Sequence, residues 1–362
     1  MTLSLESVSK TVGREVHIHE ANLTFETGSR NVLLGRTLAG KTTLLRLMAG
    51  LDRPTTGRIL VNGEDVTGMS VRKRKVAMVY QQFINYPSMT VYDNIASPLK
   101  LAGMDKETIR KRVHETAEVL HLEPLLDRLP AELSGGQQQR TAIARALVKD
   151  AQLLLLDEPL VNLDYKLREE LRIELQQIFQ RREAVVVYTT TEPTEALMLG
   201  GDIVVVDEGC ILQTGPTPEV YHHPATLKVA EVFSDPPINT IDGAVGENGG
   251  TIGKHISIPL LGHLKTVAPG EYRFAVRSNH LFLERQGPED TEIRVEVELS
   301  EISGSETYIH VRHNGTPLVV QDTGVKRHKI GAEISVFVHP ERLYVYDLAG
   351  SLVASPAGRR PA

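Results

Sequence analysis

The chain has 362 residues, of which 41% are hydrophobic and 24% are charged, as in an ordinary globular protein. Its 40 basic and 46 acidic residues give a net charge of −6, so we expect no nucleic-acid partner, although a local site can still bind a nucleotide. The single cysteine, Cys210, excludes an internal disulfide and a cysteine-based metal cluster. No apolar run is long enough to span a bilayer, and residues 1–10 lack a secretory signal pattern.

Residues 1–240 are predicted to form an α/β domain with a parallel sheet, because short apolar runs alternate with segments of helical periodicity. A helical subdomain is expected at about 88–150, with Asp105 as the N-cap of one helix. Another helix carries Leu167, Leu171, Leu175 and Ile178 on one face. The strands of the sheet are expected at 31–35, 77–80, 153–156, 184–190 and 203–206.

After the proline-rich segment 234–240, the pattern changes. Apolar and charged residues alternate strictly at 292–299, as in a half-buried strand. Asn314-Gly315 separates two strand-like runs and is typical of a hairpin turn. Residues 241–350 are therefore predicted to form a small all-β, OB-like barrel domain, followed by a frayed tail at 351–362.

The segment GRTLAGKT, residues 35–42, fits the pattern G-x-x-x-x-G-K-[ST] between a predicted strand and a predicted helix. Backbone N–H groups of such a loop converge on phosphate oxygens where the helix dipole favours negative charge. The Lys41 side chain adds a positive charge, and the Thr42 hydroxyl is a candidate Mg²⁺ ligand. A glycine-rich turn with a solvated lysine is the alternative. The candidate nucleotide-binding residues here are Gly35, Arg36, Thr37, Leu38, Ala39, Gly40, Lys41, Thr42 and Thr43.

Three further motifs follow in a fixed order: LSGGQQQR at 133–140, LLLLDEP at 153–159 and VNLD at 161–164. Together with the phosphate loop they resemble the ABC ATPases. The segment VYQQFINYPSMTVYDNI at 79–95 is similar to the Q-loop of sugar-type importers, and the β-rich domain resembles their regulatory barrel. The resemblance is closest to the maltose and glycerol-phosphate subgroup. The phrases GRTLAGKT and YTTTEP are similar to glycerol importer ATPases that work as unlike pairs.

This resemblance implies a role for each motif. Asp157 would hold Mg²⁺ through water, Glu158 would act as general base, and Gln81 would contact the metal or the water. The signature would complete the ATP site of an opposing subunit, so that two ATP molecules join a dimer; its candidate residues are Ser134, Gly135, Gly136 and Gln137.

The implied partners are a second ATPase subunit, expected to be a paralogue, two transmembrane permease subunits and, indirectly, a solute-binding protein. The implied location is the cytoplasmic face of the inner membrane. The implied function is ATP hydrolysis that drives uptake of glycerol or a related polyol or sugar. Two alternatives stay open: a catalytically weak regulatory partner in a heterodimer, and a soluble ABC ATPase without a transport role.

Four residues depart from the family pattern. Val12 stands where an aromatic residue usually stacks on adenine, and Leu38 where glycine is usual. Val161 replaces a serine, and Thr191 aligns with the switch histidine and is the candidate residue for that role. We hypothesise that this chain's own ATP site hydrolyses slowly; family drift with full activity is the alternative. In the barrel, residues 275–281 replace a segment with Arg-Pro-Glu, so inherited regulatory contacts are not expected.

Overall fold

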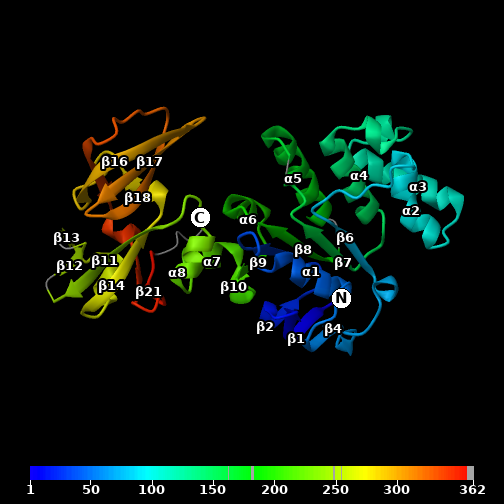
Figure 1. Cartoon of the computed structure of the whole chain (residues 1–362), viewed down its shortest axis with the longest axis horizontal. Coiled ribbons are helices and arrows are strands. Elements are labelled where there is room, and N and C mark those ends of the chain that lie inside the picture. Colours follow the sequence, from blue (N-terminus) through cyan, green and yellow to red (C-terminus); the bar gives the residue numbers. More distant parts are fainter. Residues whose placement is uncertain (162, 181–182, 248, 254, 357–362) are drawn as a thin grey trace. The chain divides into compact units, whose positions relative to one another are not determined.

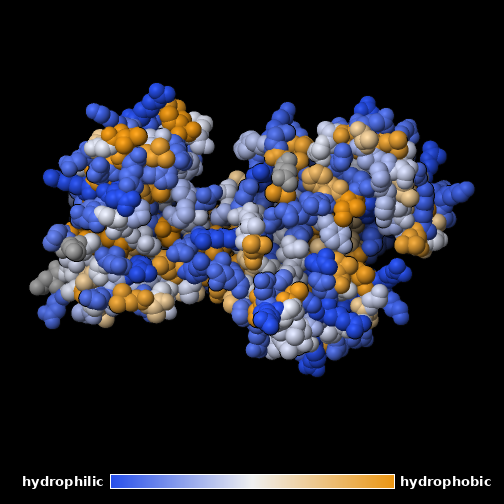
Figure 2. Space-filling view, viewed as in Figure 1, coloured by the Kyte–Doolittle hydropathy of each residue, from blue (hydrophilic) through white to orange (hydrophobic). Residues whose placement is uncertain are grey.

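The computed structural model describes residues 1–161, 163–180, 183–247, 249–253 and 255–356. The chain divides into two compact units, Met1–Thr217 and Pro218–Ala362. Within the described ranges, no helix is both long enough and apolar enough to cross a membrane. On the face shown in Figure 2, hydrophobic side chains of each unit occur in small groups among hydrophilic ones.

A six-stranded sheet forms the centre of the first unit (Figure 1). Its strand order is β10-β9-β3-β8-β7-β6, with β3, β6, β7, β8 and β9 parallel and β10 antiparallel to β9. The bounds are β3 Arg30–Leu34, β6 Val76–Val79, β7 Leu153–Asp157, β8 Val185–Thr190, β9 Asp202–Asp207 and β10 Cys210–Pro216. The five predicted strands are therefore all present. Strands β7 and β8 are buried along their whole length, which explains their continuous apolar runs.

A second sheet in this unit is antiparallel, with the order β2-β1-β4-β5. Its strands are β1 Leu3–Val12, β2 Glu15–Phe25, β4 Thr56–Val61 and β5 Glu64–Asp65. The sequence analysis did not predict this sheet. Register shifts at three places along the β1–β2 pairing interrupt the two-residue alternation by which a half-buried strand is recognised.

The helices of the first unit form two groups. Helix α1 Lys41–Ala49 follows β3, α5 Tyr165–Gln180 precedes β8, and α6 Pro193–Leu199 follows it. Helices α2 Val91–Leu101, α3 Lys106–Val119 and α4 Gly135–Leu147 lie together beside the edge strand β6 and fall within the expected range 88–150 (Figure 1). Asp105 is the N-cap of α3, where its side chain accepts a hydrogen bond from the Thr108 N–H.

The boundary between the units differs from the expected one after residue 240. Two helices lie in the intervening segment, α7 Thr217–His222 and α8 Leu227–Val232. Helix α8 shares a hydrophobic cluster with the strands of the second unit; the members are Leu227, Ala230, Ile238, Ala275, Tyr344 and Tyr346. Because this apolar face packs on the second unit, residues 218–240 group with it.

The second unit is all-β apart from its helical entry, as predicted. One antiparallel sheet has the order β13-β12-β11-β14-β20-β21, and the other β15-β19-β16-β17-β18; together they make a small barrel-like structure around one core. The bounds are β11 Asn239–Gly246, β12 Gly249–Ile252, β13 Ile256–Ile258, β14 Gly270–Val276, β15 Leu281–Phe282, β16 Thr291–Ser303, β17 Glu306–His313, β18 Thr316–Thr323, β19 Glu333–Val338, β20 Tyr344–Tyr346 and β21 Leu352–Ala354.

Two details of this unit differ from expectation. The predicted tail at 351–362 begins with strand β21, which pairs with β20, so the ordered domain extends to Ala354; residues 357–362 lie outside the described residues. In β16 the inward alternation ends after Val297, because a register shift follows it and turns Leu299 outward, where it is 43% exposed. The predicted hairpin is confirmed: Asn314 and Gly315 both have positive φ between β17 and β18.

Candidate nucleotide site

The phosphate loop connects the end of β3 to the start of α1. A Cβ at Gly35 would lie 2.3 Å from the Val206 carbonyl oxygen, and Gly40 adopts φ +104 against Ile18, so neither position accepts a side chain. Helix α1 has no side-chain cap and no acidic residue in its first turn. Its first N–H groups are therefore available to an anion, and the helix dipole favours one there.

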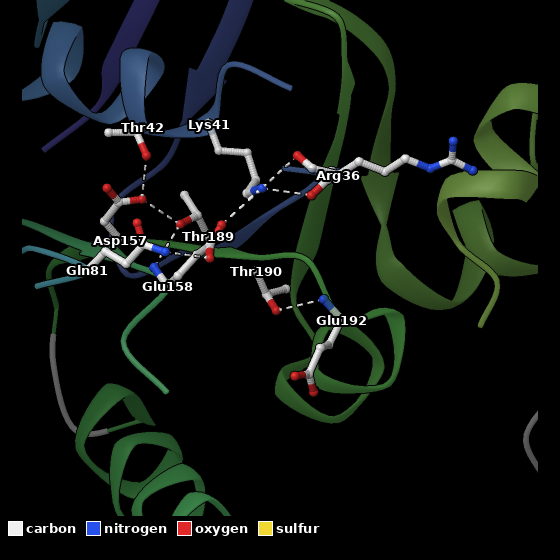
Figure 3. Close-up of polar contacts among 10 residues, drawn as sticks. Arg36, Lys41, Thr42, Gln81, Asp157, Glu158, Thr189, Thr190 and Glu192 are labelled. Atoms are coloured by element: carbon white, nitrogen blue, oxygen red, sulfur yellow. Dashed lines mark hydrogen bonds and ion pairs between the residues drawn. The ribbon is translucent and has the colours of Figure 1, made fainter. Parts of the chain in front are cut away.

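Lys41 turns its amino group back into the loop. It donates to the carbonyl oxygens of Gly35, at 2.7 Å, and Arg36, at 3.0 Å, and lies 3.1 Å from the Glu158 carboxylate (Figure 3). The Lys41 side chain is only 4% exposed. A buried ammonium group needs anionic or polar partners, and a polyphosphate offers the same kind of partner as this carboxylate and these carbonyls. The loop therefore fits a nucleotide phosphate chain.

Asp157 ends the buried strand β7, where its carboxylate meets two hydroxyl groups. Thr42 and Thr189 each donate to Asp157 Oδ1 at 3.0 Å. Burial raises the pKa of Asp157, and these two hydrogen bonds oppose the rise. A hydroxyl and a carboxylate oxygen beside a phosphate-binding loop are the hard oxygen donors that Mg²⁺ takes together with substrate phosphates. The residues therefore fit Mg²⁺, with Thr42 and Asp157 as the protein donors.

Glu158 directly follows β7 and has a positive φ of 43°, a conformation that non-glycine residues adopt at a cost and that clusters at functional sites. Thr189 accepts a hydrogen bond from the Glu158 N–H at 2.9 Å and so fixes this turn. Gln81 Nε2 donates to Glu158 Oε2 at 3.2 Å (Figure 3). The structure thus brings together Lys41, Thr42, Gln81, Asp157 and Glu158, which the sequence analysis had placed in one site.

The signature residues form a separate group at the start of α4. Ser134 is the N-cap: its hydroxyl accepts from the Gln137 N–H at 3.3 Å, and its own N–H donates to Gln137 Oε1 at 3.0 Å. A Cβ at Gly136 would lie 1.9 Å from Leu167 Cδ2. Gly136 of the signature therefore packs on α5, whereas Lys41 and Thr42 of the phosphate loop contact Glu158 and Asp157 at the end of β7.

Three of the four departures from the family pattern occupy exposed positions. Leu38 is 95% exposed and has a φ of +68. A positive φ is the conformation in which a leucine costs free energy at a position usually held by glycine. Val12 ends β1 and is 51% exposed. Thr191 follows β8 and is exposed, and Val161 is half-buried. Asn162, in the same motif as Val161, lies outside the described residues.

The sequence analysis missed several polar residues around β8. Thr189 is fully buried and bonds to both acidic neighbours, as described above. Tyr188, also buried, donates to Glu195 Oε1 at 2.7 Å. Arg168 of α5 binds both carboxylate oxygens of Glu192, at 2.6 and 2.8 Å. The only signal in the sequence for these residues was the run of threonines 189–191 at the carboxyl end of the apolar strand β8.

Comparison with known proteins identifies two domains. Residues 18–161 match the family model of the ABC transporter, and residues 274–345 match the TOBE domain. The chain is 35% identical to an sn-glycerol-3-phosphate import ATP-binding protein, UgpC, of Yersinia pestis, over 98% of this chain and 99% of that protein. It is 37% identical to a trehalose/maltose import ATP-binding protein, MalK, of Thermococcus litoralis, over 95% of this chain and 96% of that protein.

Solved structures agree with this result. A dimeric post-hydrolysis state of the ATP-binding cassette MJ0796, bound to ADP and Pi, is 29% identical with a TM-score of 0.54, and the match covers 59% of this chain and 98% of that chain. The expected likeness to importer ATPases is confirmed by relatives that match along nearly the whole length of the chain. The chain therefore belongs to the family of ABC transporter ATP-binding proteins.

Proposed function

We propose that this chain is the ATP-hydrolysing motor subunit of an ABC importer. The observation that carries the proposal is the convergence of Lys41, Thr42, Asp157 and Glu158 at the first turn of α1. Lys41 and the N–H groups of α1 would bind the phosphate chain of ATP. Thr42 and Asp157 would hold Mg²⁺, which neutralises phosphate charge when bound.

Glu158 is proposed to orient and deprotonate the attacking water. Its carboxylate now faces Lys41 and Gln81, at 3.1 and 3.2 Å. Binding of a triphosphate would give Lys41 stronger anionic partners and leave the Glu158 carboxylate available to a water molecule. Gln81 would keep that carboxylate oriented. Thr189, through its bond to the Glu158 N–H, would hold the backbone in the required conformation.

The signature is proposed to act on a second ATPase subunit. Ser134 and the two glycines after it stand at the start of α4, where Gly136 packs on Leu167 of α5 and Gly135 has open space around it. A hydroxyl and free N–H groups at a helix N-terminus suit a γ-phosphate. Two chains would thus close on two ATP molecules, and hydrolysis would release them. Whether the second subunit is another copy or a paralogue is decided by the subunits that co-purify with the tagged chain.

The segment after Gln81 is proposed to contact the permease subunits at the cytoplasmic face of the membrane. It exposes three apolar side chains: Ile84 at 53%, Tyr86 at 45% and Met89 at 39%. The loop is nonetheless fixed, because the buried Asn94 side chain bonds to the backbone of Tyr86, Met89 and Thr90. A rigid surface with exposed apolar groups is suited to binding another protein.

The ATP site formed by this chain's own phosphate loop is proposed to hydrolyse ATP slowly. Thr191 offers only a hydroxyl, whereas the imidazole of a histidine at this position would reach farther and could carry a charge. The solute is proposed to be glycerol or a related polyol or sugar, since the relatives named above are import proteins for sn-glycerol-3-phosphate and trehalose/maltose. A soluble role without transport is not favoured by these relatives.

The test is ATP turnover by the full chain and by the assembly that co-purifies with it, in Mg²⁺. In the full chain measured by itself, Lys41→Ala should abolish nucleotide binding, and Glu158→Gln should retain binding but reduce the chain's own turnover at least about a hundredfold. Glu107→Gln, which removes an exposed carboxylate from the first turn of α3, is the matched control and should change neither. Full turnover by Glu158→Gln would refute the proposed role of this carboxylate.

A further inference from the structure

Helix α5 contacts both the signature helix and the loop that carries Thr191. These two segments serve different ATP molecules in the proposed dimer: the signature faces the partner's ATP, and Thr191 faces the chain's own. The contacts of α5 therefore bear on how the two sites influence each other, an inference that rests on the proposed function.

The contact with α4 is close and partly ionic. Leu167 of α5 fills the space beside Gly136 so tightly that a Cβ there would lie 1.9 Å from Leu167 Cδ2. Two turns after Leu167 on α5, the carboxylate of Glu174 pairs with Arg140 of α4: Arg140 Nη2 lies 3.1 Å from Glu174 Oε1, and the two side chains are 10% and 13% exposed. A buried ion pair of this kind is costly to separate, because removing one partner leaves a buried charge. Helices α4 and α5 are thus held together at two points.

The contact with the Thr191 loop involves Arg168, the residue next to Leu167. One Arg168 nitrogen binds both oxygens of the Glu192 carboxylate, at 2.6 and 2.8 Å. The Glu192 N–H in turn donates to Thr190 Oγ1 at 3.0 Å. Thr191 lies between these two bonded residues (Figure 3 shows Thr190 and Glu192). The guanidinium of Arg168 therefore holds the backbone on which Thr191 is presented.

The base of this loop is also rigid. Tyr188 and Glu195, both buried, are joined by the 2.7 Å hydrogen bond already described, which ties the end of β8 to α6. Because the base is fixed, a movement of Arg168 acts on Glu192 and Thr191 rather than being absorbed by the whole loop.

We propose that Arg140 and Arg168 are positioning residues of one relay, in which α5 transmits closure of the signature on the partner's ATP to the Thr191 loop of this chain's own site. When the signature shifts toward the partner's phosphate, α4 moves against Leu167 and Glu174. Since α5 is a continuous helix, Arg168 moves with it and repositions Glu192. The relay makes the two ATP sites interdependent.

A double-mutant cycle tests the relay. The measured quantity is the ATP concentration for half-maximal turnover by the assembly purified through a tag on this chain. Arg140→Gln and Arg168→Gln are each expected to raise it about tenfold. The double variant is expected to be no worse than the worse single variant, because either substitution already breaks the relay. If the two residues acted independently, their effects would multiply, and the double variant would raise the half-saturating ATP concentration about a hundredfold. That result would overturn the proposal. An unchanged half-saturating concentration in either single variant would also overturn it.

Three measurements separate the relay from a merely structural role. Glu169→Gln removes an ion pair made within α5, to Arg172 at 2.5 Å, and is expected to leave the half-saturating concentration unchanged and to add nothing to Arg140→Gln. ADP binding by the isolated chain should be the same in all variants. Combining Arg168→Glu with Glu192→Arg should restore the half-saturating concentration; failure of this rescue contradicts the relay.

If Arg140→Gln does not fold, Glu174→Gln takes its place in the cycle, since it neutralises the other half of the same pair. A different result would refute the proposed function. If Lys41→Ala left the ATP turnover of the assembly unchanged, this chain would not be an ATP-hydrolysing motor subunit, and the relay would be refuted as well. If the wild-type assembly hydrolyses ATP normally but the effects of Arg140→Gln and Arg168→Gln multiply in the double variant, only the relay is refuted.

Discussion

Replacing Leu38 by glycine is expected to stabilise the first unit, although the same change usually destabilises a protein. Leu38 is 95% exposed, so its side chain contributes almost no burial that could be lost. Its φ of +68 lies in the left-handed region, which a residue with a Cβ adopts only at a cost. Glycine removes that cost and keeps the loop geometry.

The magnitude follows from two opposing contributions. The left-handed conformation costs leucine about 1–2 kcal/mol. Glycine gives the unfolded chain more freedom, which costs about 0.4–1 kcal/mol on folding. The net expectation is a gain of about 0.5–1 kcal/mol, which corresponds to a rise in the Tm of this unit of about 1–4 °C.

Calorimetry on the full chain, with the transition of each unit followed separately, is the assay. Leu101→Gly is the matched control, because Leu101 is also highly exposed, at 91%, but ends helix α2. There glycine should lower the Tm, since it weakens a helix by up to about 1 kcal/mol. Leu38→Ala should give no gain, because alanine keeps the Cβ. A lower Tm for Leu38→Gly, or an equal gain for Leu38→Ala, would refute the reasoning.

Three further outcomes are expected. Val12→Tyr should raise affinity for ATP about fivefold or more, measured by equilibrium binding, because an aromatic ring stacks on adenine with about 1–3 kcal/mol; unchanged affinity would place the base elsewhere. Burial raises the pKa of Glu195 above its ordinary 4.5, so the folded state favours the protonated form and wild-type stability falls as pH rises through the raised pKa. Glu195→Gln cannot ionise, so its Tm relative to wild type should increase from pH 4 to pH 8; a constant difference would contradict this. Gly315→Ala, at φ +88 with open space around its Cβ, should lower the Tm of the second unit through backbone strain of about 1 kcal/mol, and an unchanged transition would contradict a strained turn.

Local chemistry explains why much of the site could be predicted. The phosphate loop is contiguous, and Asp157 and Glu158 end a continuous apolar run, so their place at the carboxyl edge of a buried strand follows from pattern alone. Asp105, Asn314 and Gly315 act through their own backbone neighbours and were recognised for the same reason.

Features that depend on distant segments could not be predicted. The antiparallel sheet of β1, β2, β4 and β5 was missed because register shifts break the alternation of its strands. Residues 218–240 were assigned to the first domain because α8 resembles any short helix until it packs on Tyr344 and Tyr346. Strand β21 was taken for a tail because three residues carry too little pattern to be recognised without their partner β20.

The sequence by itself determined which side chains gather at the phosphate-binding loop, since the pattern that identifies this loop lies within a few residues of one turn. Only the tertiary structure decided which contacts support these side chains. They are the hydrogen bond from Thr189 to Asp157, the ion pair of Arg168 with Glu192 and the ion pair of Arg140 with Glu174. Each joins residues that are more than twenty positions apart. Such contacts arise from the packing of α5 and β8 against their neighbours, and packing depends on shapes that no single segment contains.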